Sequence, residues 1–156
     1  MRIAIFGKNC KKEDLCYIED LLSQISLRSD KLIIAKEFFT YLQDKITFPE
    51  NSSIVALEED KISTQQIDVL FSLGGDGTLL DTLSVVKNSC IPVLGINLGH
   101  LGFLTSVGRA DIKNLLTEIE KQHYKFEKHS VLQASCEALI GKRFAINEVC
   151  VRSLSP

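Results

Sequence analysis

Apolar and polar positions along the first 123 residues follow two alternating patterns. Short runs rich in isoleucine, leucine and valine are typical of buried strands. The strand candidates are residues 2–6, 31–37, 67–73 and 91–97, with 52–60 either a further strand or an irregular link. Between them, apolar residues recur every three or four positions, which is typical of helices with one buried face. The helix candidates are residues 12–26, 38–46, 78–88 and 110–122. This alternation predicts an α/β domain with a mostly parallel, Rossmann-like sheet.

The pattern changes after residue 123. Residues 124–139 and 142–151 are long and extended in character, and a turn around Gly141 joins them. They predict a β-hairpin of a different, all-β architecture. Because a lone hairpin is at best marginally stable in water, either it joins a sheet elsewhere in this chain or the protein continues past Pro156. We expect the second, with residues 1–123 forming an α/β nucleotide-binding domain. Residues 124–156 would be the start of an all-β domain that continues past this sequence.

Composition narrows the class of protein. Hydrophobic residues make up 45% and charged residues 24%, which is typical of a folded globular protein. A net charge of −2 gives no electrostatic basis for binding nucleic acid or an anionic membrane. The five cysteines are odd in number and form no CxxC pair, which favours free thiols over a zinc site or a disulfide framework. We therefore expect a cytoplasmic protein.

Two glycine-rich turns follow two of the predicted strands. GGDGT occupies residues 74–78 after the strand at 67–73, and GHLGF occupies residues 99–103 after the strand at 91–97. The carboxyl ends of neighbouring parallel strands open onto one edge of a sheet, where α/β proteins bind ligands. We therefore expect the two turns to meet at one site.

The carboxylate within GGDGT is the main chemical signal. Gly74, Gly75 and Gly77 allow backbone N–H groups to approach a phosphate closely, whereas a carboxylate beside a phosphate is repelled. Asp76 could accept the proton of an attacking hydroxyl, or hold a divalent metal ion on the phosphates. The alternative is a tight strand-to-helix turn in which Asp76 only caps the helix. The complete five-residue string after a buried strand favours the functional interpretation.

Three motifs in order resemble the NAD kinase family. They are GGDGTLL at 74–80, GINLGHLGFLT at 95–105 and NEV at 147–149. Phosphofructokinases and the diacylglycerol and sphingosine kinases carry forms of GGDGT, but the second motif is similar to that of NAD kinases alone among these. The resemblance spans nearly the whole chain.

The resemblance implies that Asp76 is the catalytic base, which takes the proton of the 2′-hydroxyl of the adenosine ribose of NAD. It also implies that Gly77 lines the nucleotide and that Gly74 and Gly75 shape the phosphate-binding turn.

Four further residues gain roles from the resemblance. It implies that Phe103 lies against the adenine of NAD, with Leu104 beside it in the pocket. It implies that Asn147 and Glu148, in a strand, bind the ribose and organise the site. From the residues alone, Phe103 is equally suited to a hydrophobic core. For the Asn-Glu pair, the residues alone favour ordinary polar positions of a strand.

The implied reaction is ATP + NAD giving ADP + NADP. The resemblance also implies a divalent ion, with Mg²⁺ the expected one, on the ATP phosphates, and a homodimer or homotetramer. No residue is identified as a metal ligand. The family also carries a second GDG segment and a serine/threonine-rich segment, and neither occurs here. Two alternatives stay open: another GGDGT kinase, acting on a lipid or a sugar phosphate, and a short, non-catalytic nucleotide-binding module.

Overall fold

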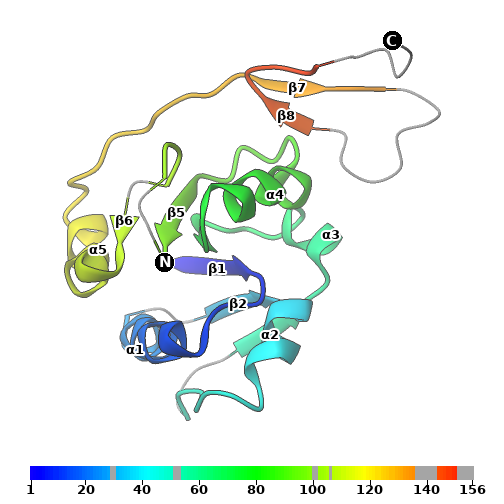
Figure 1. Ribbon diagram of the computed structural model, residues 1–156. Helices are drawn as coiled ribbons and strands as arrows, with labels where there is room; N and C mark the ends of the chain where they lie inside the picture. The colour runs from blue at the N-terminus through cyan, green and yellow to red at the C-terminus, as the bar shows by residue number, and fades with distance from the viewer. Residues whose placement is uncertain (29–30, 51–53, 100–101, 106, 136–143, 151–156) are drawn as a thin grey trace.

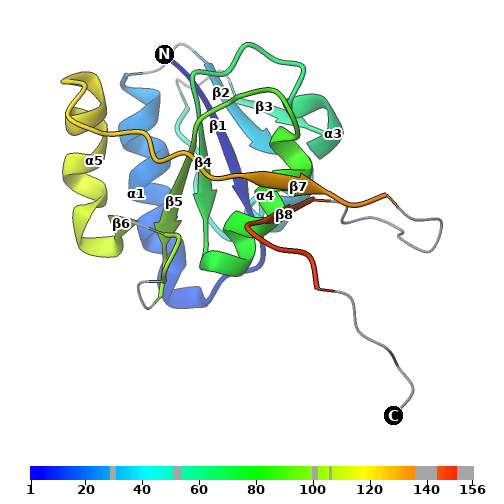
Figure 2. The same cartoon turned by 90° about the horizontal axis from the view of Figure 1, so that it is seen from above.

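The main body of the protein is a six-stranded parallel sheet with helices on both faces (Figures 1 and 2). The computed structural model describes residues 1–28, 31–50, 54–99, 102–105, 107–135 and 144–150. The strands are β1 (Arg2–Gly7), β2 (Lys31–Ala35), β3 (Ile54–Leu57), β4 (Val69–Leu73), β5 (Val93–Asn97) and β6 (Val107–Gly108). Every pair of neighbours in this sheet is parallel, as the sequence predicts.

The strand order is β3-β2-β1-β4-β5-β6. The chain moves outward from β1 to β2 and β3, returns to the other side of β1 with β4, and continues outward through β5 and β6. This is the Rossmann order, and its direction reverses between β1 and β4. The crevice beyond the carboxyl ends of those two strands is where doubly wound sheets bind ligands.

Among the described residues, five helices and two short 3-10 turns accompany this sheet, of which η2 and α5 follow its last strand. They are α1 (Leu15–Ser26), preceded by η1 (Lys12–Asp14), then α2 (Lys36–Leu42), α3 (Glu59–Ile62), α4 (Asp76–Val86) and α5 (Ile112–Glu120), preceded by η2 (Arg109–Asp111). Helices α1 and α5 pack together on one face, and α3 and α4 on the other (Figures 1 and 2). Among the described residues, no helix has both the length and the apolar character that crossing a membrane requires.

The central strands are buried on both faces, which explains why they are continuous apolar runs instead of alternating ones. Residues Ile3 to Phe6 of β1 are at most 1% exposed. Helix α1 contributes Ile18, Leu21, Leu22 and Ile25, which share one face at helical spacing.

Element boundaries differ from the prediction at several places. Lys36 and Glu37 belong to α2, not to the strand before it, and residues 54–57 form a true strand. Helix α4 begins at Asp76, two residues earlier than predicted, so the aspartate lies in the first helical turn. The short elements β6 and α3 were not predicted, since two and four residues carry no periodic signal.

A separate antiparallel pair follows α5. Strands β7 (Val131–Gln133) and β8 (Phe144–Ile146) pair over three residues each, much less than the runs that predicted them. An exposed segment, 121–130, connects α5 to β7, and β8 lies against α4 (Figure 1). The hairpin therefore lies beside the helix that Asp76 begins.

Two leucines, one within α1 and one just after its end, test the assigned core. Leu22 of α1 is fully buried, whereas Leu27, just after the helix, is 83% exposed. We expect Leu22→Ala to lower the free energy of unfolding by about 2–5 kcal/mol, and Leu27→Ala by less than about 0.5 kcal/mol. Urea denaturation followed by circular dichroism measures both. Equal losses in the two variants would contradict this packing of α1.

Candidate functional site

The two glycine-rich turns meet at the carboxyl edge of the sheet, as predicted. Strands β4 and β5 are parallel neighbours, and the turns follow them directly. The backbone N–H of Gly74 donates to the carbonyl of Ile96 at 3.0 Å, which extends the pairing to the base of the first turn. His100 and Leu101 of the second turn lie outside the described residues.

The three glycines of GGDGT differ in whether the surrounding structure requires glycine at that position. Gly74 has φ of 151°, and a Cβ there would overlap the side chain of Thr78, so both its conformation and its packing require glycine. A Cβ on Gly75 or Gly77 would meet no atom within 4 Å. Packing within the described protein therefore explains Gly74 only, and open space adjoins the other two.

The carboxylate of Asp76 is bound to the second turn. Its Oδ2 accepts a hydrogen bond from the backbone N–H of Phe103 at 2.8 Å. Its Oδ1 accepts from the N–H groups of Leu104 at 3.2 Å and Thr105 at 3.1 Å, and from the Thr105 hydroxyl at 3.0 Å. No side-chain hydrogen bond caps α4, so the interpretation of Asp76 as a helix cap is wrong.

These hydrogen bonds favour the ionised form of the Asp76 carboxyl. Partial burial raises the pKa of the Asp76 carboxyl, but the hydrogen bonds from Phe103, Thr105 and Leu104 together outweigh it and hold that pKa below its ordinary value. Asp76 also lies in the first turn of α4, where the helix dipole favours a negative charge. The group is therefore ionised at neutral pH and can accept hydrogen bonds or a proton.

Glycine is required where the second turn approaches this carboxylate. A Cβ on Gly102 would overlap both oxygens of Asp76. Behind the turn, a Cβ on Gly95 of β5 would lie 2.9 Å from Cγ2 of Thr105. Two glycines of GINLGHLGFLT thus leave the space that the Asp76 carboxylate and Thr105 occupy.

Two polar residues of this site were not predicted from the sequence. Thr105 and Asn97 are 2% and 3% exposed, and the Asn97 amide donates to the Thr105 hydroxyl at 2.9 Å. Both lie within the motif GINLGHLGFLT. A polar residue at the end of a buried strand and a threonine after the turn were the available signals.

An ion pair with η1 supports the entrance to the second turn. The Arg109 guanidinium donates to the carbonyl of Leu98 and pairs with the carboxylate of Asp14, which is 4% exposed. Because Asp14 is buried, removal of Arg109 would leave its carboxylate without this compensating charge. The two contacts of Arg109, with Leu98 and with Asp14, thus fix the path of the chain just after β5.

Phe103 and Leu104 have different environments. The ring of Phe103 is fully exposed, so the core alternative for it is wrong. Leu104 is half-buried. The backbone of both residues is fixed by Asp76, whereas the Phe103 ring is free to contact a ligand.

Asn147 and Glu148 follow β8 and are not part of the strand that was expected to contain them. Asn147 has a left-handed φ of 69°, and its N–H donates to the carbonyl of Ser130 at 3.3 Å. Both side chains are exposed. Within the described part of the chain neither forms a hydrogen bond with Asp76, although β8 packs on the helix that Asp76 begins.

The site offers little to a metal ion on its own. The described residues contain no group of three or more His, Cys, Asp or Glu side chains that could hold one. Asp81, one helical turn beyond Asp76, forms an ion pair with Lys8, which follows β1. A metal ion here would take most of its ligands from a nucleotide and water, as Mg²⁺ commonly does.

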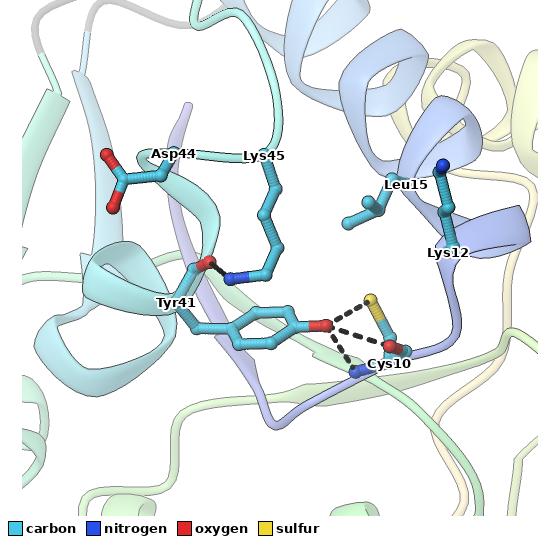
Figure 3. Close-up of a pocket in the computed structure, with 6 residues that line it drawn as sticks. All are labelled: Cys10, Lys12, Leu15, Tyr41, Asp44 and Lys45. Carbon is cyan, nitrogen blue, oxygen red and sulfur yellow. Dashed lines mark hydrogen bonds between the residues drawn. The ribbon is translucent and has the colours of Figure 1, made fainter.

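A cavity of about 530 Å³ lies away from this carboxylate, between the loop after β1 and α2 (Figure 3). The Tyr41 hydroxyl donates to the Cys10 carbonyl at 2.8 Å and accepts from the Cys10 N–H at 3.3 Å. Burial, chiefly, raises the pKa of the Cys10 thiol, so it stays protonated and unreactive at neutral pH. These contacts hold the loop on α2, and none of the predicted site residues lines the cavity.

Gly102→Ala tests the contact between the turns. The new methyl group would displace the Asp76 carboxylate and break its hydrogen bonds, so we expect the pKa of Asp76 to rise towards its ordinary value of about 3.9. A ¹³C NMR titration of the side-chain carboxyl measures this change. Gly99→Ala is the control, because a Cβ there lies 3.7 Å from its nearest atom, Oδ1 of Asn97. An Asp76 pKa that is the same in both variants would contradict the assigned contact.

Known proteins with similar sequences are NAD kinases by name. The NAD kinase of Flavobacterium johnsoniae is 33% identical over 162 residues, which cover 97% of this chain and 52% of that protein. The NAD kinase of Bacteroides fragilis is 29% identical over 153 residues, covering 97% of this chain and 51% of that protein. The chain thus spans about half the length of the curated relatives it matches.

A solved structure shares the fold. Yeast NADH kinase complexed with NADH superimposes with a TM-score of 0.71 at 20% identity, over 93% of this chain and 45% of the yeast chain. The family model for the ATP-NAD kinase N-terminal domain matches residues 5–124, a segment that contains the second half of β1, strands β2 to β6 and both glycine-rich turns. This chain therefore belongs to the ATP-NAD kinase N-terminal domain family.

Proposed function

We propose that this chain carries the catalytic base of an NAD kinase, which transfers the γ-phosphoryl group of ATP to the 2′-hydroxyl of the adenosine ribose of NAD. The observation that carries the proposal is the ionised carboxylate of Asp76, fixed at the edge of the sheet where two glycine-rich turns meet. Relatives named NAD kinase at about 30% identity support the choice of substrate.

Asp76 acts as a general base in this reaction. A ribose hydroxyl is a poor nucleophile at neutral pH, and a positioned base accelerates its attack by roughly a hundredfold or more. The hydroxyl oxygen bonds to the γ-phosphorus, the bond from that phosphorus to ADP breaks, and the hydroxyl proton passes to Asp76. The lowered pKa of this carboxyl makes it a weak base, so its contribution depends on its position beside the hydroxyl.

The remaining predicted residues take roles around the carboxylate. Gly75 and Gly77 leave open space for the nucleotide, and Gly74 forms the turn. The exposed ring of Phe103 stacks on adenine, with Leu104 beside it.

Asn147 and Glu148 bind the ribose from the β7–β8 hairpin, which lies on α4. In this proposal residues 1–123 form the nucleotide-binding domain, and residues 124–156 are the first part of an all-β domain that binds NAD.

A divalent ion accompanies ATP in this proposal. Mg²⁺, held mainly by the phosphates, would neutralise the charge that develops on the transferred group. The enzyme would work in the cytoplasm as a homodimer or homotetramer.

Asp76→Asn in the full-length protein tests the role of the base. We expect the rate of NADP formation to fall by at least about a hundredfold with NAD binding retained, because the amide cannot accept the hydroxyl proton. Turnover is measured with ATP and NAD, and binding by calorimetry.

To distinguish the alternative functions, sphingosine, diacylglycerol and fructose 6-phosphate are offered to the wild-type protein in parallel. Phosphorylation of one of these instead of NAD would favour the other GGDGT kinases. NAD binding without turnover in the wild type would favour the non-catalytic module, and unchanged NADP formation in the variant would refute the role of Asp76.

Gly77→Ala separates a ligand-binding glycine from a structural one. Alanine is the better helix former and has room here, so we expect the free energy of unfolding to stay constant or rise by up to about 1 kcal/mol. Nucleotide affinity should nevertheless fall roughly tenfold, about 1.4 kcal/mol, because the methyl group occupies the ligand's space. Denaturation and calorimetry measure the two quantities, with Ser84→Ala on the same helix as control. Unchanged affinity would exclude Gly77 from the nucleotide site.

A further inference from the structure

The Thr105 hydroxyl is surrounded by groups that determine where its proton points. It accepts hydrogen bonds from the Asn97 amide at 2.9 Å and from the Gly102 N–H at 3.2 Å. Backbone N–H and amide NH₂ groups only donate, so these two contacts occupy the two lone pairs of the hydroxyl oxygen. Its single proton is then left for Oδ1 of Asp76, at 3.0 Å.

The orientation of the Asn97 amide is fixed in the same way. Its Oδ1 accepts a hydrogen bond from the backbone N–H of Gly99 at 2.8 Å. Because a backbone N–H can only donate, the atom facing Gly99 must be the amide oxygen. The amide NH₂ must therefore face Thr105. Asn97 and Thr105 are both almost fully buried, so water does not compete for these hydrogen bonds.

The two oxygens of Asp76 are consequently unequal. Oδ1 accepts three hydrogen bonds, from the Leu104 N–H, the Thr105 N–H and the Thr105 hydroxyl. Oδ2 accepts one, from the Phe103 N–H. Because a carboxylate oxygen has about two lone-pair sites, Oδ1 is saturated and Oδ2 retains capacity for another donor.

We propose that Thr105 is a positioning residue for Asp76, with its hydroxyl directed by Asn97, so that Oδ1 anchors the carboxylate and Oδ2 accepts the proton of the substrate hydroxyl. The inference rests on the proposed kinase function for its substrate, but the arrangement of hydrogen bonds that it describes can be tested without turnover. Thr105 itself touches neither substrate nor phosphate in this scheme.

The packing around Thr105 supports a fixed position. Its side chain lies over β5, where Gly95 has no Cβ to displace it, and Cδ1 of Leu79 of α4 approaches the same point. Thr105 is thus held by β5, through its Cγ2 at Gly95, and by Asp76, the first residue of α4, through its hydroxyl. A side chain clamped on both sides can hold the carboxylate in one orientation.

The test compares three variants of the full-length protein. Thr105→Val keeps the shape and removes the hydroxyl, and Thr105→Ser keeps the hydroxyl. Thr82→Val removes another buried hydroxyl, on α4, which donates to the carbonyl of Leu79 and not to Asp76. Circular dichroism first establishes the pH range over which each variant is folded.

The first readout is the ¹³C NMR titration of the Asp76 carboxyl within that range. We expect its pKa to rise in Thr105→Val, because a donor to the charged form is lost, and to stay at the wild-type value in Thr105→Ser and Thr82→Val. A wild-type pKa in Thr105→Val, or an equal rise in Thr82→Val, would overturn the inference. This readout holds whether or not the protein phosphorylates NAD.

The second readout is steady-state kinetics with NAD and ATP. We expect kcat to fall roughly tenfold in Thr105→Val, with KM for NAD within about twofold of wild type, because a misdirected base affects turnover more than binding. Thr105→Ser should restore most of the loss. If kcat is unchanged in Thr105→Val although Asp76→Asn is inactive, the positioning role is refuted and the proposed function stands. If Asp76→Asn is fully active, the proposed function fails, and the titration alone decides what Thr105 does to the carboxylate.

Discussion

The carboxylate of Asp76 accepts four hydrogen bonds from three successive residues, 103–105, which lie 27 to 29 positions further along the sequence, and this contact joins the two glycine-rich turns. It fixes the start of α4, the path of the chain after β5 and the ionised state of the carboxylate. It also determines where the Phe103 ring is presented. The arrangement of the site follows from one partly exposed carboxylate at the edge of the sheet, whose hydrogen bonds come from three backbone N–H groups and the Thr105 hydroxyl.

The fold makes this contact possible at the place where a Rossmann sheet binds ligands. Parallel pairing brings the ends of β4 and β5 together, and the strand order reverses next to β4. Two glycines then remove the Cβ atoms that would keep the elements apart: Gly102 at the carboxylate and Gly95 beneath Thr105. Gly75 and Gly77 differ, since open space adjoins them, and in the proposed enzyme that space belongs to the nucleotide.

The sequence predicted the larger elements because their periodicity is local, and it predicted the meeting of the turns because parallel strands share an edge. It did not predict the partners of Asp76, since backbone N–H groups carry no residue-specific signature. Asn97 and Thr105 were missed because their function depends on contacts between strands and turns. Asn147 was expected within a strand, but its left-handed φ places it just after β8, and no sequence pattern required that conformation. The roles proposed for the exposed residues rest on the family resemblance, because packing alone leaves them undefined.

A crystal structure of the full-length protein with NAD bound tests the central claim most directly. The account predicts that the oxygen of the adenosine ribose 2′-hydroxyl lies about 2.6–3.2 Å from Oδ2 of Asp76. The three hydrogen bonds to Oδ1 should remain intact in that complex. A ribose bound with its 2′-hydroxyl beyond reach of Asp76, or a carboxylate released from residues 103–105 when NAD binds, would contradict the account.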